Sequence, residues 1–264
     1  RPCSYHFRDG FMISKNRLKY LTSLKIKKHR NKANQVLIEG VRLIDESIKA
    51  GADIEFLYCT NEFMADYSDR EFVKMIESSH IPIDKINNND MDQLADSINH
   101  QGIIGLANIK VGNYKEQLEC DNQLILDSIS DPGNLGNILR TSDWFGLKNI
   151  YLSDDCADPY NSKVIRSAMG AHFYIDIFQL DIVQHIKYLK ENNFVIIAAD
   201  LDGESIYDYN IPQKSAIILG NEAHGISDEI CKLIDCKITI PKLGSIESLN
   251  VAMATGIILS HLNK

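Results

Sequence analysis

Short apolar segments alternate with stretches of helical periodicity along most of this chain of 264 residues. Segments that are apolar at nearly every position are typical of strands in a mostly parallel sheet, because helices cover both faces of such a sheet. The alternation therefore predicts an α/β architecture. In the second half of the chain, the predicted strands lie at 123–127, 149–152, 173–178, 194–199, 215–219 and 237–240.

The alternation is interrupted by a polar stretch at 112–122, which we interpret as a linker. It separates a small N-terminal α/β domain at 12–111 from a C-terminal, mostly parallel α/β domain at 123–264. A start at Met12 would make residues 1–11 a leader or an upstream remnant, and the alternative is that they belong to the native chain. In the N-terminal domain we expect helices at 14–31, 41–51, 63–79 and 89–98, and strands at 35–40, 54–60, 81–86 and 102–109.

Charge is distributed unevenly along the chain. The net charge is −8, yet residues 1–32 contain ten Lys and Arg residues and a single acid, which gives this segment +9 and the remainder −17. Such asymmetry suits a polyanion such as RNA, although a solvated helix face would explain the same pattern. The expected RNA contacts are Lys25, Lys27, Lys28 and Arg30.

Composition also disfavours several classes of protein. No apolar run approaches the length of a membrane span, and the N-terminus lacks the apolar segment of a signal peptide. The six cysteines are scattered without a C-x-x-C pair or a nearby histidine cluster. These features predict a cytoplasmic protein with reduced thiols, no membrane contact and no metal site.

Unusual residues follow the first strand of the C-terminal domain, in "DPGNLGNILRTSDWFG" at 131–146. We expect a helix from Gly136, with Asn134 in the preceding turn and Arg140 near the helix N-terminus. A cation there, together with exposed backbone N–H groups, favours an anion such as phosphate. The alternative is a salt bridge from Arg140 to Asp131 or Asp143.

A second strand end carries "AIILGNEAHGIS" at 216–227. Gly220 ends the strand, where a glycine lets the backbone approach a ligand closely. Asn221 and Glu222 follow at once, and Ser227 is a predicted N-cap. Taken alone, such a cluster is equally typical of an ordinary turn.

A third strand end carries "KITIPKLGSIESLNVAMATGIILSHL" at 237–262. We expect a helix capped by Ser248 and apolar on most sides, with Asn250 in its first turn. Capping explains Ser248, but it explains a polar Asn250 beside a buried helix less well. In open α/β sheets, ligands bind beyond the carboxyl ends of the strands, where all three stretches lie.

In order and spacing, these stretches resemble the SpoU/TrmH family of RNA ribose 2′-O-methyltransferases, which use S-adenosyl-L-methionine (AdoMet). The resemblance rests on "NLGNILRTSDWFG", "ILGNEAHGIS" and "IPKLGSIESLNVA", with support from "DPYNSKVIRSAMGAHF" at 158–173, and spans roughly 123–262. The first domain, through "VLIEGVRLIDESIKAG" and "HQGIIGLANI", resembles the ribosomal-protein-like substrate-binding domain often joined to these enzymes.

This resemblance implies a trefoil knot in the C-terminal domain, a homodimer through that domain with active sites near the interface, and a metal-free reaction. Two residues depart from the family pattern: Ala168 replaces a common serine, and Lys242 stands where the family usually has an apolar residue after Ile-Pro. The lysine bears on the cofactor loop or the dimer contact. The implied AdoMet contacts are Leu219, Gly220, Asn221, Ile240, Pro241 and Leu249. The implied catalytic residues are Asn134, Arg140, Glu222, Ser248 and Asn250.

Methyl transfer from a sulfonium is an in-line displacement that depends on alignment of the reacting atoms. Asn and Ser side chains suit positioning, and an arginine suits clamping a phosphate beside the ribose. Two-domain members mostly act on large ribosomal RNA, so that is the first expected substrate, and transfer RNA is the second. A nucleotide-binding oxidoreductase would need a G-x-G-x-x-G after a strand, which the chain lacks. A non-catalytic RNA-binding protein of the same fold is the other alternative.

Overall fold

The computed structural model describes residues 13–67, 71–114 and 122–262, which form two compact units. Unit 1 contains residues up to Lys110 together with Tyr160–Phe173, and unit 2 contains Val111–Pro159 and the chain from Tyr174 onwards. The predicted leader at 1–11 and most of the predicted linker at 112–122 lie outside the described residues. None of the described helices is both long and apolar enough to cross a bilayer.

Unit 1 is a mixed sheet with helices on both faces. Strand β4 is antiparallel to β1 and to β2, and β2 is parallel to β3, in the order β1-β4-β2-β3. One apolar cluster packs α3 and α5 on the sheet, and another packs α1 and α6. The strands are β1 (Gln35–Glu39), β2 (Ile54–Cys59), β3 (Ile83–Lys85) and β4 (Ile103–Asn108). The helices are α1 (Lys15–Ser23), α2 (Lys27–Ala33), α3 (Val41–Lys49), α4 (Asn61–Tyr67), α5 (Glu71–Ser79), α6 (Asn88–Leu94) and α9 (Ser162–Ala168), with a 3₁₀ turn η1 (Ala171–Phe173).

The basic helix predicted at 14–31 is wrong as a single element, because the chain breaks after Ser23 into α1 and α2. Leu24 is buried while Ile26 is 57% exposed, so the apolar stripe does not continue through the break. The Leu24 carbonyl accepts a hydrogen bond of 2.8 Å from the buried Arg30 guanidinium. This side chain therefore closes the corner between the two helices.

The segment at 160–173 belongs by packing to unit 1, although it follows the predicted linker in the sequence. Ile165 of α9 lies in the same apolar cluster as Val36 and Ile38 of β1, and Tyr160 and Phe173 pack against it. The family-like stretch at 158–173 thus contributes mainly to the core of unit 1.

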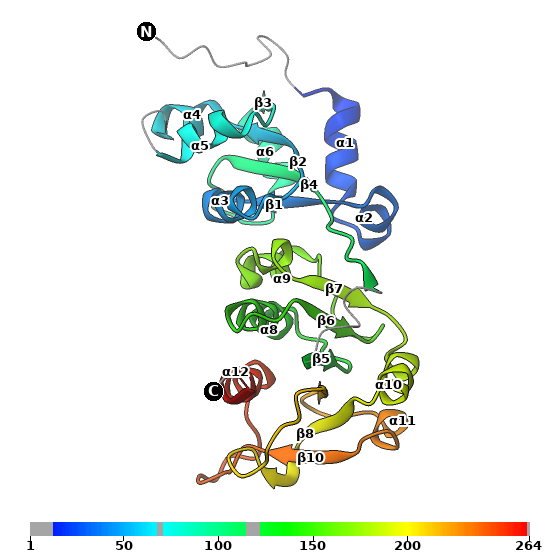
Figure 1. The fold of residues 1–264 in the computed structure, drawn as a ribbon. Helices are drawn as coiled ribbons and strands as arrows, with labels where there is room; N and C mark the ends of the chain where they lie inside the picture. Colours follow the sequence, from blue (N-terminus) through cyan, green and yellow to red (C-terminus); the bar gives the residue numbers. More distant parts are fainter. Residues whose placement is uncertain (1–12, 68–70, 115–121, 263–264) are drawn as a thin grey trace. The chain divides into compact units, whose positions relative to one another are not determined.

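Unit 2 confirms the predicted parallel sheet, in the order β10-β8-β9-β5-β6-β7 with every pair parallel. Figure 1 shows α8 and α12 on one face and α10 and α11 on the other. The strands are β5 (Asn122–Leu126), β6 (Asn149–Leu152), β7 (Asp176–Gln179), β8 (Val195–Ser205), β9 (Ser215–Leu219) and β10 (Cys236–Thr239). The helices are α8 (Pro132–Trp144), α10 (Ile182–Glu191), α11 (Asp228–Cys231) and α12 (Val251–Leu262).

Two strand predictions in unit 2 need correction. The strand expected at 173–178 begins only at Asp176, because Ala171–Phe173 form a 3₁₀ turn. The strand expected at 194–199 continues to Ser205, and its pairing with β10 shifts register between Lys237 and Ile238. The exposed second half of β8 forms one wall of the cavity described below.

The strand order of unit 2 places a switch point between β5 and β9. From β5 the chain builds β6 and β7 on one side, and then returns to build β8, β9 and β10 on the other. Loops after the strands on the two sides of such a point diverge and leave a crevice at the carboxyl ends of the strands. A ligand site is therefore expected among the residues that follow β5 and β9.

Candidate active site

Three side chains from distant parts of the sequence meet at this crevice. Asn134 follows β5, Glu222 follows β9, and Asn250 precedes α12. The Asn134 amide donates to Glu222 Oε1 at 2.5 Å. Asn250 Nδ2 donates to Asn134 Oδ1 at 2.9 Å and lies 3.3 Å from the same Glu222 oxygen. Each polar group fixes the orientation of the others, so the cluster is preorganised.

Asn134 is positioned by the start of α8, which differs from the prediction. The helix begins at Pro132 and not at Gly136, and the side chain of Asp131 caps it by accepting from the Asn134 N–H at 2.7 Å. An acidic N-cap followed by proline at the first helical position is a strong start signal. Arg140 is therefore the ninth residue of α8, and the interpretation that it lies near the helix N-terminus is wrong.

Asn250 is positioned by the start of α12. Its Oδ1 accepts from the N–H groups of Ala252 at 3.0 Å and Met253 at 3.4 Å, which is N-cap geometry. The predicted cap, Ser248, lies two residues earlier in the loop. One amide thus does two things, because its oxygen caps the helix while its nitrogen donates into the cluster.

The loop that carries Glu222 is closed by its own backbone. Asn221 and Gly225 exchange N–H···O bonds of 2.9 and 2.8 Å, and the Asn221 amide donates to the Ser128 carbonyl at 2.7 Å. A Cβ on Gly220 would lie 2.4 Å from the Gly225 carbonyl carbon. Gly220 therefore permits a close approach of two loop segments, and not only the approach of a ligand as we expected.

Sequence reasoning missed Asp127, a buried carboxylate at the end of β5. Its Oδ2 accepts from the Ser227 N–H at 2.8 Å, so it ties the loop after β9 to the strand beside it. The signal was an acid directly after the apolar run "QLIL". A buried polar group needs such hydrogen-bond partners.

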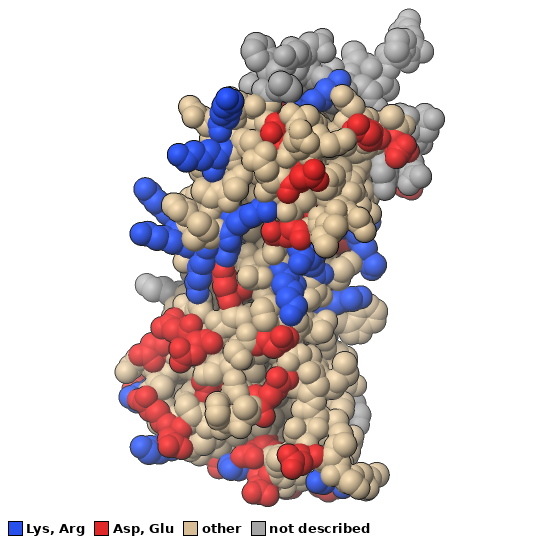
Figure 2. All heavy atoms as spheres, turned by 180° about the vertical axis from the view of Figure 1, so that it is seen from behind, with Lys and Arg blue, Asp and Glu red and all other residues tan. Residues whose placement is uncertain are grey.

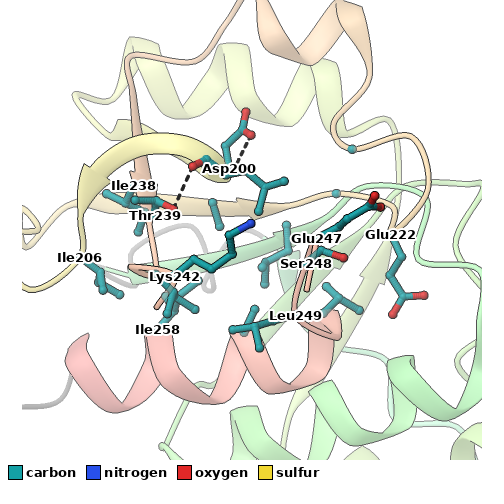
Figure 3. A pocket seen from close by; sticks show the side chains of 18 of the residues that line it. Asp200, Ile206, Glu222, Ile238, Thr239, Lys242, Glu247, Ser248, Leu249 and Ile258 are labelled. Carbon is teal, nitrogen blue, oxygen red and sulfur yellow. Dashed lines mark hydrogen bonds between the residues drawn. The ribbon is translucent and has the colours of Figure 1, made fainter. Parts of the chain in front are cut away.

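A cavity of about 530 Å³ opens beside the cluster, and its size is ordinary for a small-molecule site. Figure 3 shows it between the ends of β8 and β10, the loop that leads to α12, and α12 itself. Its apolar lining includes Ile206, Ile238 and Ile258. Eight predicted site residues line it: Leu219, Gly220, Asn221, Glu222, Ile240, Pro241, Ser248 and Leu249.

Charged side chains also line the cavity. Asp200, which sequence reasoning did not single out, accepts from Lys237 Nζ at 2.6 Å. Burial by itself raises the pKa of Asp200, but the hydrogen bonds from Lys237 and from the Leu201 backbone hold that pKa below its ordinary value. Asp200 is therefore a carboxylate at neutral pH.

Arg140 lies outside this cavity, in a groove of about 720 Å³ between α8 and α12. Trp144 and Met253 line the same groove and are 84% and 62% exposed. Among the described residues, Arg140 forms no ion pair, so the predicted alternative of a salt bridge to Asp131 or Asp143 finds no support.

The expected RNA contacts lie in unit 1 and differ in their surroundings. Arg30 is buried against the Leu24 carbonyl, and Lys25 donates to the Ala95 carbonyl and pairs with Asp96 at 3.3 Å. Lys27 and Lys28 are exposed on α2. Unit 1 carries a net charge of +3 and unit 2 of −11, and Figure 2 shows basic and acidic side chains together on the face that it draws.

Comparison with known proteins decides the family. Residues 121–260 match the SpoU rRNA methylase family, and residues 15–105 match the MRM3-like substrate binding domain. The chain belongs to the SpoU rRNA methylase family. The match covers the segments that carry Asn134, Glu222 and Asn250, so the resemblance stated from the three motifs is confirmed.

Relatives of this family are similar over nearly the whole chain. The Bacillus subtilis 23S rRNA (guanosine(2553)-2′-O)-methyltransferase RlmP is 30% identical, with 90% of this chain and 92% of the relative covered. A TrmH-family structure from Porphyromonas gingivalis is 29% identical with a TM-score of 0.80, covering 95% and 98% of the two chains. An AdoMet-bound rRNA methyltransferase from Sinorhizobium meliloti, 24% identical, shares the fold with a TM-score of 0.81 and 97% coverage of each chain.

Proposed function

We propose that this protein methylates a ribose 2′-hydroxyl in RNA with AdoMet as the methyl donor, and that its substrate is large-subunit ribosomal RNA. The observation that carries the proposal is the Asn134–Glu222–Asn250 cluster at the edge of a ligand-sized cavity in a SpoU-family chain. The name of the Bacillus relative supports the substrate class.

The residues of the cavity fit AdoMet. Its volume is suitable, and its apolar lining from β9, β10 and α12 suits a nucleoside. Asp200, Glu222 and Glu247 line it against a single lysine among the described lining residues, which suits a ligand with a net positive charge. We propose Leu219, Gly220, Asn221, Ile240, Pro241 and Leu249 as the residues that hold it.

When bound, AdoMet supplies an electrophilic methyl group on a sulfonium. The chain must then orient the ribose hydroxyl, because alignment alone contributes several kcal/mol, about seven at best. We assign this orientation to Asn134 and Ser248, whose side chains can donate and accept without charge. Glu222 keeps Asn134 in place by accepting the 2.5 Å hydrogen bond from its amide, and the Asn250 amide donates to both residues.

Arg140 is assigned to the RNA phosphate next to the reacting ribose, and this role requires a homodimer. In one chain Arg140 lines the groove between α8 and α12 and not the cavity. The exposed Trp144 and Met253 make that groove a suitable surface for a second copy. A C2 dimer built on it would use the same surface of both chains, and would bring Arg140 of one to the site of the other.

Mixing two inactive variants tests this arrangement. Arg140→Ala and Glu222→Gln homodimers should each be impaired by roughly a hundredfold or more in single-turnover methyl transfer. After the subunits are mixed and exchanged, half of the dimers are hybrids, and each hybrid holds one intact site. Activity should then return to about a quarter of wild type. If exchange is confirmed by native mass spectrometry and no activity returns, Arg140 acts within its own chain or not at all.

Unit 1 is proposed to bind the RNA through Lys27 and Lys28, with Lys25 and Arg30 contributing from their anchored positions. The exposure of the first two on the basic helix α2 supports this order of importance. A cytoplasmic location is also proposed, and it agrees with the described cysteines, which form no disulfide. The trefoil knot implied by the family stays a prediction.

The direct test is transfer of a labelled methyl group to ribosomal RNA, with transfer RNA as the competing substrate. We expect label on ribosomal RNA, and nucleotide mapping in a deletion strain should reveal one missing 2′-O-methyl group. A folded wild-type protein that binds AdoMet but labels neither RNA would favour a non-catalytic RNA-binding role. Label on transfer RNA alone would move the substrate to that class.

A further inference from the structure

Lys242 is a cation directed into the cavity. It lies in the loop between β10 and α12, and Figure 3 shows its ammonium pointing into the cavity that Asp200, Glu222 and Glu247 also line. The family pattern implied an apolar residue after the Ile-Pro pair, so a lysine here changes the chemistry of the lining. The positive charge of Lys242 is therefore the property that distinguishes this position of the cavity lining.

The carboxylates of the cavity do not neutralise this lysine. Asp200 is paired with Lys237 at 2.6 Å, and Glu222 accepts from Asn134 and Asn250. Within the described residues, the Lys242 ammonium makes no hydrogen bond or ion pair. A lysine presents a hydrated point charge with three donors, and it binds an anionic group of a ligand without needing a fixed fork geometry.

We propose that Lys242 binds the α-carboxylate of the methionyl group of AdoMet and makes the cavity selective for nucleosides that carry this amino acid. The inference rests on the proposed function, because it takes AdoMet as the ligand. AdoMet has two cationic groups and one carboxylate, and the lining offers three carboxylates and one ammonium, so the charges complement each other. Lys242 is thus a specificity-determining residue that touches the cofactor away from the reacting methyl group.

Two nucleosides isolate this contact in a binding experiment. S-adenosylhomocysteine keeps the amino acid, and methylthioadenosine keeps the nucleoside and sulfur but lacks the carboxylate. Calorimetric titration of Lys242→Met should weaken S-adenosylhomocysteine by about fivefold, the scale of an exposed ion pair, and leave methylthioadenosine within about twofold. Lys242→Arg keeps the charge and should retain most of the affinity.

The matched control is Lys187→Met, which removes an exposed lysine from α10. It should change neither affinity. Raising the salt concentration should weaken S-adenosylhomocysteine binding to wild type and to Lys187→Met, and should have little effect on Lys242→Met, because the screened charge pair is already absent there.

Four results would overturn the inference. Equal weakening of both nucleosides would place Lys242 against the nucleoside or in the loop structure, and no weakening of either would show that it makes no contact. Lower affinity for RNA alone would assign the ammonium to a phosphate. Retained affinity in Lys242→Met but not in Lys242→Arg would point to side-chain shape. By contrast, a wild-type protein that binds neither nucleoside would contradict the proposed function itself.

Discussion

Replacing Asn250 separates its structural contribution from its chemical one. Its Oδ1 caps α12, and its Nδ2 donates to Asn134 and Glu222. Asn250→Ala removes both functions, whereas Asn250→Asp keeps the capping oxygen and puts a second carboxylate oxygen where the donor was. That oxygen would face Glu222 Oε1, which lies 3.3 Å from Nδ2 in the native protein.

The two variants should differ in stability and agree in chemistry. Loss of an N-cap costs about 1 kcal/mol, which lowers the melting temperature of a domain of this size by about 2–4 °C. Asn250→Ala should show this loss. Asn250→Asp should lose less of the cap but gain like-charge repulsion, and in both variants Asn134 loses the hydrogen bond that Asn250 donates to it. We expect single-turnover methyl transfer to fall by roughly a hundredfold or more in each.

The assay pairs thermal unfolding with single-turnover transfer, and Asp181→Ala is the matched control. Asp181 caps α10 by accepting from the Gln184 N–H at 3.1 Å, in the same unit but outside the cluster. This control should lose comparable stability and keep its chemistry. An Asn250→Asp protein that transfers methyl at a near wild-type rate would refute the assignment of the cluster, because its hydrogen-bond pattern would then be irrelevant to the reaction.

Three further predictions follow from the same geometry. Gly220→Ala should destabilise unit 2 and weaken AdoMet binding together, since its Cβ would lie 2.4 Å from the Gly225 backbone. The control is Gly256→Ala, which lies outside the cavity and whose Cβ would make an ordinary contact of 3.7 Å with Thr141. It should weaken neither property when unfolding and calorimetry are compared. Burial lowers the pKa of His185 to about 4 from 6.5, so the unfolded chain binds the proton more readily than the folded one. The contribution of His185 to the free energy of unfolding should therefore be full above about pH 6.5. It should fall by about 2 kcal/mol on acidification to about pH 5. Urea unfolding at the two pH values measures this loss, and a folded His185→Gln variant should show a smaller one. Neutralising Lys27 and Lys28 should reduce the slope of log affinity for RNA against log salt concentration by about one unit for each lost phosphate contact. An unchanged slope would show that the two lysines are solvated and do not contact RNA.

The parallel sheet of unit 2 could be predicted because its strands are buried on both faces. All residues of β6 and β9 are buried, so these strands are mostly apolar and their bounds are those expected. Strand β8 ends six residues after its predicted end. The prediction stopped early because the exposed half of the strand is mostly polar, although this half pairs with β10 after a register shift. Periodicity reports burial, and it cannot report backbone pairing outside the core.

Helix boundaries and long-range packing could be predicted less well from the sequence than the strands of unit 2. Local capping chemistry was sufficient to place the start of α8 at Pro132, but the interpretation gave too much weight to Gly136. The position of Ile165 in the core of unit 1 depends on contacts with residues more than a hundred positions away, to which no local pattern refers. Likewise, the need for glycine at 220 arises from a loop that returns on itself, and a ligand explanation was equally consistent with the sequence.

The positions of Asn134 and Arg140 on α8 explain why the role proposed for Arg140 calls for a second chain. They are six positions apart, which corresponds to about 9 Å along the axis and about 120° around it in an α-helix. Asn134 consequently donates to Glu222 beside the cavity, whereas Arg140 faces the groove with Trp144 and Met253. One motif therefore supplies two surfaces: the first contributes to the site of its own chain, and the second is available to another. We infer that the spacing within this motif is suited to a site shared between two copies, which is why the hybrid-dimer experiment, and not a single substitution, decides the role of Arg140.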